Sequence, residues 1–281
     1  WYVANVAEDA DIDVAARTLA ESNKVSLVEY DIKMKLATDG LTFPYEGPVT
    51  APATRAAMSD LGFNDPLIAE QWNYYNLGDL SIASSAYAGA DINIKDTWKT
   101  LTAGDPSVIV AVVDQGVDYT HPDLVPNMWV NEAEKNGKPG VDDDGNGYVD
   151  DVHGYNFVDG EGDINYDKSQ DFDTGHGTHC AGIIGAVNNN GIGMAGVAGG
   201  TGNNDGVRIM SCQIFSKGYG GETRYSSRAI KYAADNGASV ISCSYGYPGG
   251  TFMSDGEFLR EDGAEAAAEI GRASCRERVL Q

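Results

Sequence analysis

Three short segments carry side chains that could cooperate in hydrolysis. In the first, Asp114 directly follows a run of apolar residues. The second segment is Gly-His-Gly-Thr-His-Cys at 175–180, in which His176 precedes a stretch of small residues. The third segment is Ser-Cys-Ser at 242–244. A carboxylate that accepts the Nδ1 proton of an imidazole fixes its tautomer and leaves Nε2 free as a general base. Asp114 and His176 are therefore predicted to form such a pair.

Alternating strands and helices are predicted to position these segments. The run at 107–113 is apolar and rich in β-branched residues, which is typical of a parallel strand covered on both faces. Further strands are predicted at 207–215 and 238–244, and helices at 176–187 and 225–236. This order predicts an α/β fold with a doubly wound, mainly parallel sheet, whose carboxyl edge would hold the site.

The three segments, in this order, resemble the subtilisin-like serine proteases, and the thermitase branch in particular. The resemblance covers about 64–268 and implies that Asp114 is the triad aspartate and His176 the triad histidine. It implies protein or peptide substrates and a buried, free thiol at Cys180 beneath the histidine. It also implies a substrate-binding edge made of Gly218, Tyr219, Gly220, Gly221, Ser244, Tyr245 and Gly246.

The printed sequence departs from this family at the nucleophile. It contains no Gly-Thr-Ser segment and none of the asparagine context that supplies the family's oxyanion donor. Residues 269–281 carry three arginines and a cysteine and look like a translated sequencing adapter, so we expect the protease sequence to continue past residue 268. The chain as printed is predicted to be inactive. The alternative is a calcium-dependent binding or adhesion module on a degenerate protease fold.

An acidic loop predicts a cation site. Eleven of the 42 acidic residues lie between 142 and 173. Counted from residue 142, the sequence matches positions 1, 3, 5, 6 and 9 of an EF-hand-type calcium loop, and the seventh residue would offer its backbone carbonyl. The predicted ligands are Asp142, Asp144, Asn146, Tyr148 and Asp150. Position 12 is His153, so the last carboxylate must come from elsewhere, and Asp151 or a later residue could supply it. A solvated acidic turn is the alternative.

The family resemblance implies a second calcium site. Its carboxylate ligands would be Asp65 and Asp123, which are distant in sequence. The remaining ligands would be the side chain of Asn190 and the backbone carbonyls of Val187, Ile192 and Met194. Such an ion would join the start of the mature enzyme to its core.

The N-terminal part is predicted to be a separate unit. Residues 1–37 combine a helical pattern near 12–19 with strand-like alternation at 25–36, and they resemble the end of an inhibitor-like propeptide. The resemblance implies that this propeptide occludes the cleft. Residues 38–62 hold three of the nine prolines and are predicted to be a linker with the processing site. The peptidase domain would span 63–268, and 269–281 would be a non-native tail.

Charge and hydropathy narrow the functional classes. Nineteen basic and 42 acidic residues give a formal net charge of −23, which disfavours nucleic-acid and membrane-surface binding. No apolar run approaches the roughly 18 residues of a membrane span. The resemblance implies a protein that is secreted or at the cell surface, although no signal peptide is visible.

Overall fold

The computed structural model describes only part of the chain. The described residues are 5, 11–22, 35–36, 61–78, 87–164, 175–216, 219–220 and 223–246. Most of the predicted strand at 25–36, nearly all of the linker at 38–62 and the tail at 269–281 lie outside them. The predicted N-terminal helix is present as α1 (Ile12–Glu21).

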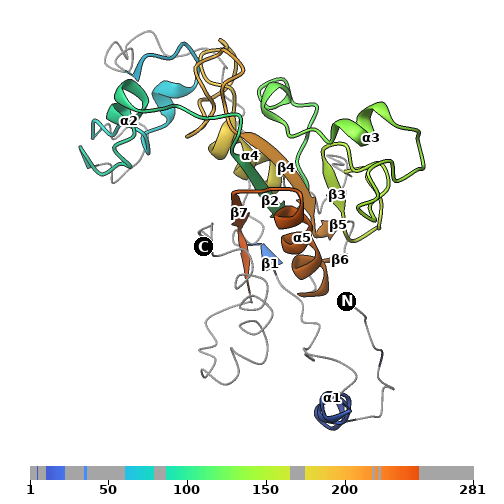
Figure 1. The fold of residues 1–281 in the computed structure, drawn as a ribbon. Coiled ribbons are helices and arrows are strands. Elements are labelled where there is room, and N and C mark those ends of the chain that lie inside the picture. The colour runs from blue at the N-terminus through green and yellow to red at the C-terminus, as the bar shows by residue number, and fades with distance from the viewer. Residues whose placement is uncertain are drawn as a thin grey trace.

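A parallel sheet of four strands organises the described part of the peptidase domain (Figure 1). Its order is β3-β4-β2-β7, and every neighbouring pair is parallel. The strands are β2 (Ile109–Asp114), β3 (Gly154–Asn156), β4 (Arg208–Gln213) and β7 (Val240–Cys243). The predicted parallel α/β architecture is confirmed, but β3 was not predicted because three residues are too few to show a periodicity.

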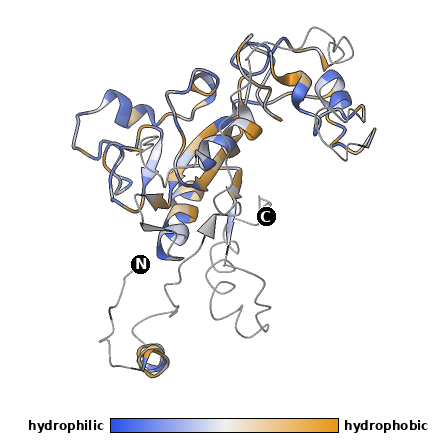
Figure 2. Ribbon diagram, turned by 180° about the vertical axis from the view of Figure 1, so that it is seen from behind, coloured by the Kyte–Doolittle hydropathy of each residue, from blue (hydrophilic) through white to orange (hydrophobic). Residues whose placement is uncertain are grey.

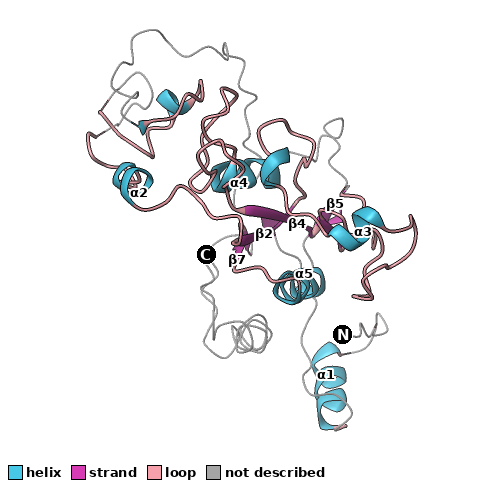
Figure 3. Cartoon of the chain, turned by 45° about the horizontal axis from the view of Figure 1, so that its top comes forward, coloured by secondary structure: helices cyan, strands magenta, loops and turns pink. Residues whose placement is uncertain are grey.

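Two helices cover opposite faces of this sheet. Helix α4 (His176–Gly185) lies above the strands and α5 (Thr223–Asp235) lies below them in Figure 3. Both pack on β2 and β4. Helix α5 stops where predicted, since Gly237 adopts a left-handed φ of 82° and lets the chain turn into β7. The sheet is therefore the middle of three layers.

Alternate residues of the central strand feed two separate cores. Ala111 and Val113 of β2 pack in the cluster that includes Ala229, Tyr232 and Ala233 of α5. Val112 packs instead in the cluster that includes Ala181 of α4. Successive side chains of a strand point to opposite faces, so a strand buried on both faces must be apolar throughout. The apolar centre formed by these strands is visible in Figure 2.

The remaining elements are short and surround the sheet. A third apolar cluster, which includes Tyr74 and Trp98, lies in the part that precedes β2. The described short elements are β1 (Lys35–Leu36), η2 (Ile68–Glu70), α2 (Lys95–Thr100), η3 (Val125–Asn127), α3 (Glu132–Asn136), β5 (Phe215–Ser216), β6 (Tyr219–Gly220) and β8 (Tyr245–Gly246). Strand β5 pairs with β6, and β1 with β8, both antiparallel. Among the described residues, no helix is long and apolar enough to cross a bilayer.

Candidate active site

The predicted carboxylate–imidazole pair is present at the carboxyl edge of the sheet. Asp114 is the last residue of β2 and His176 is the first residue of α4. The distance between His176 Nδ1 and Asp114 Oδ1 is 2.8 Å, and the two residues are only 6% and 1% exposed. This hydrogen bond stabilises the imidazolium and raises the pKa of His176 above its ordinary value of 6.5. The geometry leaves Nε2 as the nitrogen that can accept a proton.

The small residues around His176 allow α4 to start against the loop that follows β2. A Cβ atom on Gly177 would lie 2.3 Å from the carbonyl oxygen of Gly116, so only glycine fits there. One residue further on, Thr178 Oγ1 accepts the backbone N–H of Asp118 at 2.9 Å. The Gly-His-Gly-Thr segment thus packs the start of α4 against the loop that follows the strand carrying the carboxylate.

Cys180 lies beside the pair as predicted, but it is half-buried instead of buried. Its sulfur is 3.9 Å from His176 Nδ1. Cys180, Cys212 and Cys243 are all free thiols. Burial raises the pKa of Cys243 to about 11 and shifts the pKa of Cys212 upward as well, so both remain protonated packing residues.

The predicted substrate-binding edge is described in part. Tyr219 and Gly220 form β6, while Gly218 and Gly221 lie outside the described residues. Ser244 directly follows β7, and Tyr245 and Gly246 form β8. Strand β8 already has an antiparallel partner, because it pairs with residues 35–36 of the N-terminal segment. Strand β8 can therefore accept an extended chain as its antiparallel partner.

The acidic loop gathers carboxylates, but not the full set that the EF-hand spacing predicts. Ligand oxygens of Glu134, Asp144 and Asp151 all lie within 4.8 Å of one another. Asn146 donates to both aspartates, at 3.1 Å and 3.0 Å. Asp151 is fully buried, and this burial raises its pKa to about 6. Three oxygen ligands of this kind, two of them buried, suit a hard cation.

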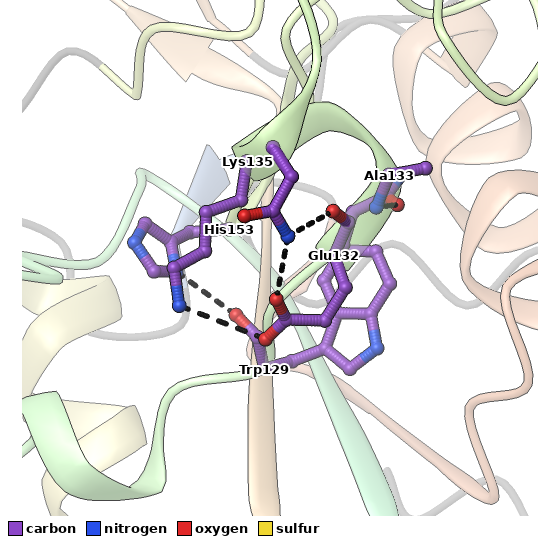
Figure 4. A network of polar contacts seen from close by, with 7 residues as sticks. Trp129, Glu132, Ala133, Lys135 and His153 are labelled. Carbon is purple, nitrogen blue, oxygen red and sulfur yellow. Dashed lines mark hydrogen bonds and ion pairs between the residues drawn. The ribbon is translucent and has the colours of Figure 1, made fainter.

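Two other predicted ligands of this loop bond to backbone groups. Asp142 accepts the N–H groups of Gly145 and Gly147, at 2.7 Å and 2.8 Å. Asp150 accepts the N–H of Gly140 at 2.8 Å. At position 12 of the predicted calcium loop, His153 faces the backbone of Trp129 (Figure 4). The distance from His153 Nδ1 to the Trp129 carbonyl oxygen is 2.9 Å, so the histidine has a structural partner. Tyr148 donates its N–H to Asn146 at 2.7 Å.

Glu134 was missed by the sequence reasoning. It lies in α3, outside the loop whose spacing drew attention, and it is only 5% exposed. Its two oxygens accept the N–H groups of Asp143 and Asp150, at 2.7 Å and 2.9 Å. The available signal was an acidic residue shortly before the loop, and this signal is weak.

The residues predicted for the second calcium site also come together. Asp123 accepts the side-chain N–H of Asn190 at 2.7 Å and the backbone N–H of Met194 at 3.0 Å. Asp65 accepts the backbone N–H groups of Asn189 and Asn190, at 2.7 Å and 3.3 Å. Both carboxylates are 2% exposed, and burial raises the pKa of each.

The second site thus joins segments that are far apart in sequence. The backbone N–H of Val187 donates to the carbonyl of Asp123 at 2.9 Å, and the side-chain oxygen of Asn190 accepts the N–H of Ile192 at 2.8 Å. The charge of Asp123 contributes to the raised pKa of Asp65. A bound cation would reverse the sign of this interaction between two buried carboxylates.

Comparison with known proteins gives one consistent result. The chain matches the Subtilase family (Peptidase_S8) over residues 105–276. It is 38% identical to Subtilisin-like protease 1 of Plasmodium vivax over 161 residues, which cover 57% of this chain and 24% of that protein. It is 32% identical to the halolysin-like extracellular serine protease Nep of Natrialba magadii over 183 residues, covering 65% and 26%.

A solved structure also aligns with this chain. Fervidolysin of Fervidobacterium pennivorans, a keratinolytic enzyme related to subtilisin, aligns with a TM-score of 0.47 and 25% identity over 78% of this chain and 27% of that one. The chain spans about a quarter of the length of the curated relatives described above. The family match covers more than half of the chain and includes both members of the Asp114–His176 pair. The chain belongs to the subtilase family.

Proposed function

We propose that the protein is a secreted, calcium-stabilised serine endopeptidase. The single observation that carries the hydrolytic part is the buried hydrogen bond between Asp114 and His176 at the carboxyl edge of the sheet. Secretion is supported by the relative that is named as extracellular. The relatives are named as proteases, so the predicted alternative of a binding or adhesion module is not favoured.

In the proposed mechanism, each described residue has one task. Asp114 holds the Nδ1–H of His176 and stabilises the imidazolium that forms. His176 Nε2 takes the proton of a serine hydroxyl, and that oxygen attacks the carbonyl carbon of the scissile peptide bond. His176 then gives the proton to the leaving amine, and water hydrolyses the acyl-enzyme. The serine is the one member of this mechanism that the described residues do not supply.

The test is hydrolysis by the protein expressed from its complete gene. We expect cleavage of casein, inhibition by a serine-directed reagent such as phenylmethylsulfonyl fluoride, and loss of cleavage on replacement of the serine. The 281-residue chain should not hydrolyse casein. A complete protein that folds, carries the serine and leaves casein intact would contradict the proposal.

Calcium is proposed at both carboxylate sites. Three acidic residues converge at the acidic loop, and at the second site two buried carboxylates interact electrostatically. Oxygen ligands of this kind are those that Ca²⁺ prefers. At the acidic loop, Glu134, Asp144 and Asp151 would hold the ion, together with the predicted loop residues that can turn toward it. At the second site, Asp65 and Asp123 would hold it. The ion would supply positive charge that offsets carboxylate repulsion and thereby stabilise the fold.

The N-terminal segment is proposed to act as an intramolecular inhibitor. Its strand β1 pairs with β8, which is part of the predicted substrate-binding edge. An extended peptide that adds a strand to an exposed edge gains backbone hydrogen bonds with little dependence on side chains. A substrate that needs the same edge would be excluded while β1 is in place. Adding a peptide of residues 1–37 to the mature enzyme should therefore inhibit it competitively.

A further inference from the structure

The small β5–β6 sheet forms one part of the predicted substrate-binding edge. In the described part of the chain it consists of these two strands, with Phe215 paired to Gly220 and Ser216 paired to Tyr219. Strand β6 is hydrogen-bonded to β5 along one edge, and an extended peptide could add to its other edge through backbone hydrogen bonds. A two-stranded sheet is at best marginally stable by itself, so other contacts must hold it in place.

One attachment of β5 comes from β4, next to the candidate catalytic pair. Gln213 of β4 is the register partner of Asp114, and the backbone N–H of Ile214 donates to the carbonyl of Asp114 at 2.8 Å. The side chain of Gln213 donates to the carbonyl of Phe215 at 2.9 Å. Phe215 also packs in a buried core cluster, and its ring centroid lies 6.0 Å from that of Tyr245. These contacts place the start of β5 relative to Asp114.

The second attachment is a side chain from the turn that follows β3. The Ser216 hydroxyl donates to Asp159 Oδ2 at 2.9 Å, and the same oxygen accepts the side-chain N–H of Asn156 at 2.8 Å. Asn156 is fully buried, and its Oδ1 accepts the backbone N–H groups of Val158 and Asp159, at 3.1 Å and 3.2 Å. Two donors thus fix the Asp159 carboxylate against β5. Hydrogen bonds to an ionised carboxylate are stronger than those between neutral groups.

We propose that Asp159 is a positioning residue for the substrate-binding edge. It acts through Ser216, which is 4% exposed and is the register partner of Tyr219 in β6. This inference rests on the proposed function, because it needs a peptide substrate that pairs with β6. Asp159 itself is exposed and takes no part in the apolar clusters. Its loss would therefore release β5 and β6 relative to the Asp114–His176 pair without opening the core.

The expected effect depends on the length of the substrate. A long peptide binds in part through β6, so a displaced β6 weakens its binding, whereas a single-residue ester reaches only the groups beside the scissile bond. Asp159→Ala should raise the KM of the long peptide by about tenfold, the size of effect expected when a hydrogen bond to a charged group is lost. Its kcat and both constants of the ester should stay at the parent values, because uniform binding alone is lost.

The experiment measures both substrates with the complete protein. The long substrate is a hexapeptide copied from a cleavage site in casein, and the short one is the acetylated ethyl ester of the residue that precedes the cut. Asp159→Asn keeps an oxygen that accepts hydrogen bonds, so its hexapeptide KM should lie between those of the parent and of Asp159→Ala. Ser216→Ala should act like Asp159→Ala, and the double variant should be no worse than either, because both remove the same hydrogen bond.

Glu161→Gln is the matched control. Glu161 is exposed on the same turn and contacts it through its backbone carbonyl, which accepts the N–H of Asn156 at 2.9 Å. This variant should keep the parent constants for both substrates. Ester hydrolysis verifies that each variant folds, and Ser216→Ala carries the test if Asp159→Ala does not.

Two outcomes would overturn the inference. One is an unchanged hexapeptide KM in Asp159→Ala and Ser216→Ala, and the other is an equal change in the constants of both substrates, which would indicate a general structural role. In either case the parent still hydrolyses casein and the proposed function stands. A folded parent that carries the serine and cleaves neither casein nor the ester would instead count against the proposed function.

Discussion

At the scale of single residues, one hydrogen bond decides what the site can do. Asp114 Oδ1 accepts both the Nδ1–H of His176 and the backbone N–H of Gln115, at 2.8 Å and 2.7 Å. A carboxylate fixed in this way favours the charged form of the imidazole. The pKa of His176 is therefore raised, and a higher pH than an isolated histidine requires is needed before Nε2 is free to accept a proton.

This dependence gives a prediction for the pH profile. Activity should fall as the pH drops through the pKa of His176, at a point above 6.5. Replacing Asp114 by Asn removes the cause of the raised pKa, so the acidic limb should move toward lower pH. The maximal rate should fall at the same time by about 10⁴-fold, because the imidazole then takes the wrong tautomer. The measurement is kcat/KM against pH for a peptide substrate.

His179→Ala is the matched control for this prediction. His179 lies on the same helix but is exposed, and its backbone N–H donates to the carbonyl of Gly175. The variant should keep the pH profile and the rate of the parent. An Asp114→Asn profile with an unmoved acidic limb would contradict the role given to the carboxylate.

The sequence predicted the contact between Asp114 and His176, but only part of the carboxylate group at the acidic loop. Asp114 and His176 stand in segments whose types and order are specific, so their meeting could be predicted. Glu134 could not be, because a carboxylate from a helix joins the loop only through the tertiary fold. Some loop aspartates accept hydrogen bonds from backbone groups, as Asp150 does, and others lie close to neighbouring carboxylates. The spacing in the sequence does not distinguish the two.

At the scale of elements, the first turn of α4 must approach the loop after β2 closely. Gly177 is buried, and its Cα faces the carbonyl oxygen of Gly116. Asp118 and Thr178 are hydrogen-bonded across the same contact. The position of His176 relative to Asp114 therefore depends on how closely the helix packs on this loop.

Gly177→Ala should disturb that contact. The added Cβ would lie 2.3 Å from the Gly116 oxygen, so the helix start must shift away. We expect a lower melting temperature and a kcat reduced by at least about tenfold, since small displacements of reacting groups are costly. Gly182→Ala, on the same helix, is the control. Its new Cβ would meet only Met194 Sδ at 3.6 Å, so activity should be kept.

The acidic loop gives a second prediction at this scale. Replacing Glu134 by Gln keeps the size of the side chain but removes its charge from the group formed with Asp144 and Asp151. Calcium affinity, measured by titration calorimetry, should fall by at least about tenfold. Asp105→Asn is the control, because Asp105 is exposed and, in the described structure, its carboxylate bonds only to nearby Ser107. An unchanged affinity in the Glu134 variant would show that the ion binds elsewhere.

At the scale of the whole molecule, stability is expected to depend on calcium. Chelation by EDTA should lower the melting temperature of the complete protein, and added calcium should restore it. Ligand present at 100 times its dissociation constant contributes about 2.7 kcal/mol to the free energy of unfolding. An identical melting curve before and after exhaustive chelation would refute both proposed sites at once.

The architecture was more predictable than the details of its periphery. Both faces of the sheet are buried. Strand β2 is therefore an apolar run and α4 is rich in small residues, and both elements could be predicted from the sequence. Strand β3 and the β1–β8 pair are only two or three residues long, and their partners are far away in sequence. Such short strand pairs form only in the completed fold, so no local sequence pattern predicts them.

The buried carboxylate of Asp151 in the acidic loop also affects how the molecule opens. Tyr232 of α5 donates its hydroxyl to Asp151 at 2.6 Å, and its ring packs edge-on against Tyr148 of the loop. These contacts join the loop to the core helix α5. Segments joined through buried contacts tend to exchange their amide hydrogens as one cooperative unit. Amides near Asp151 should therefore exchange with deuterium at the slow pace of α5, and not at the rate usual for a surface loop.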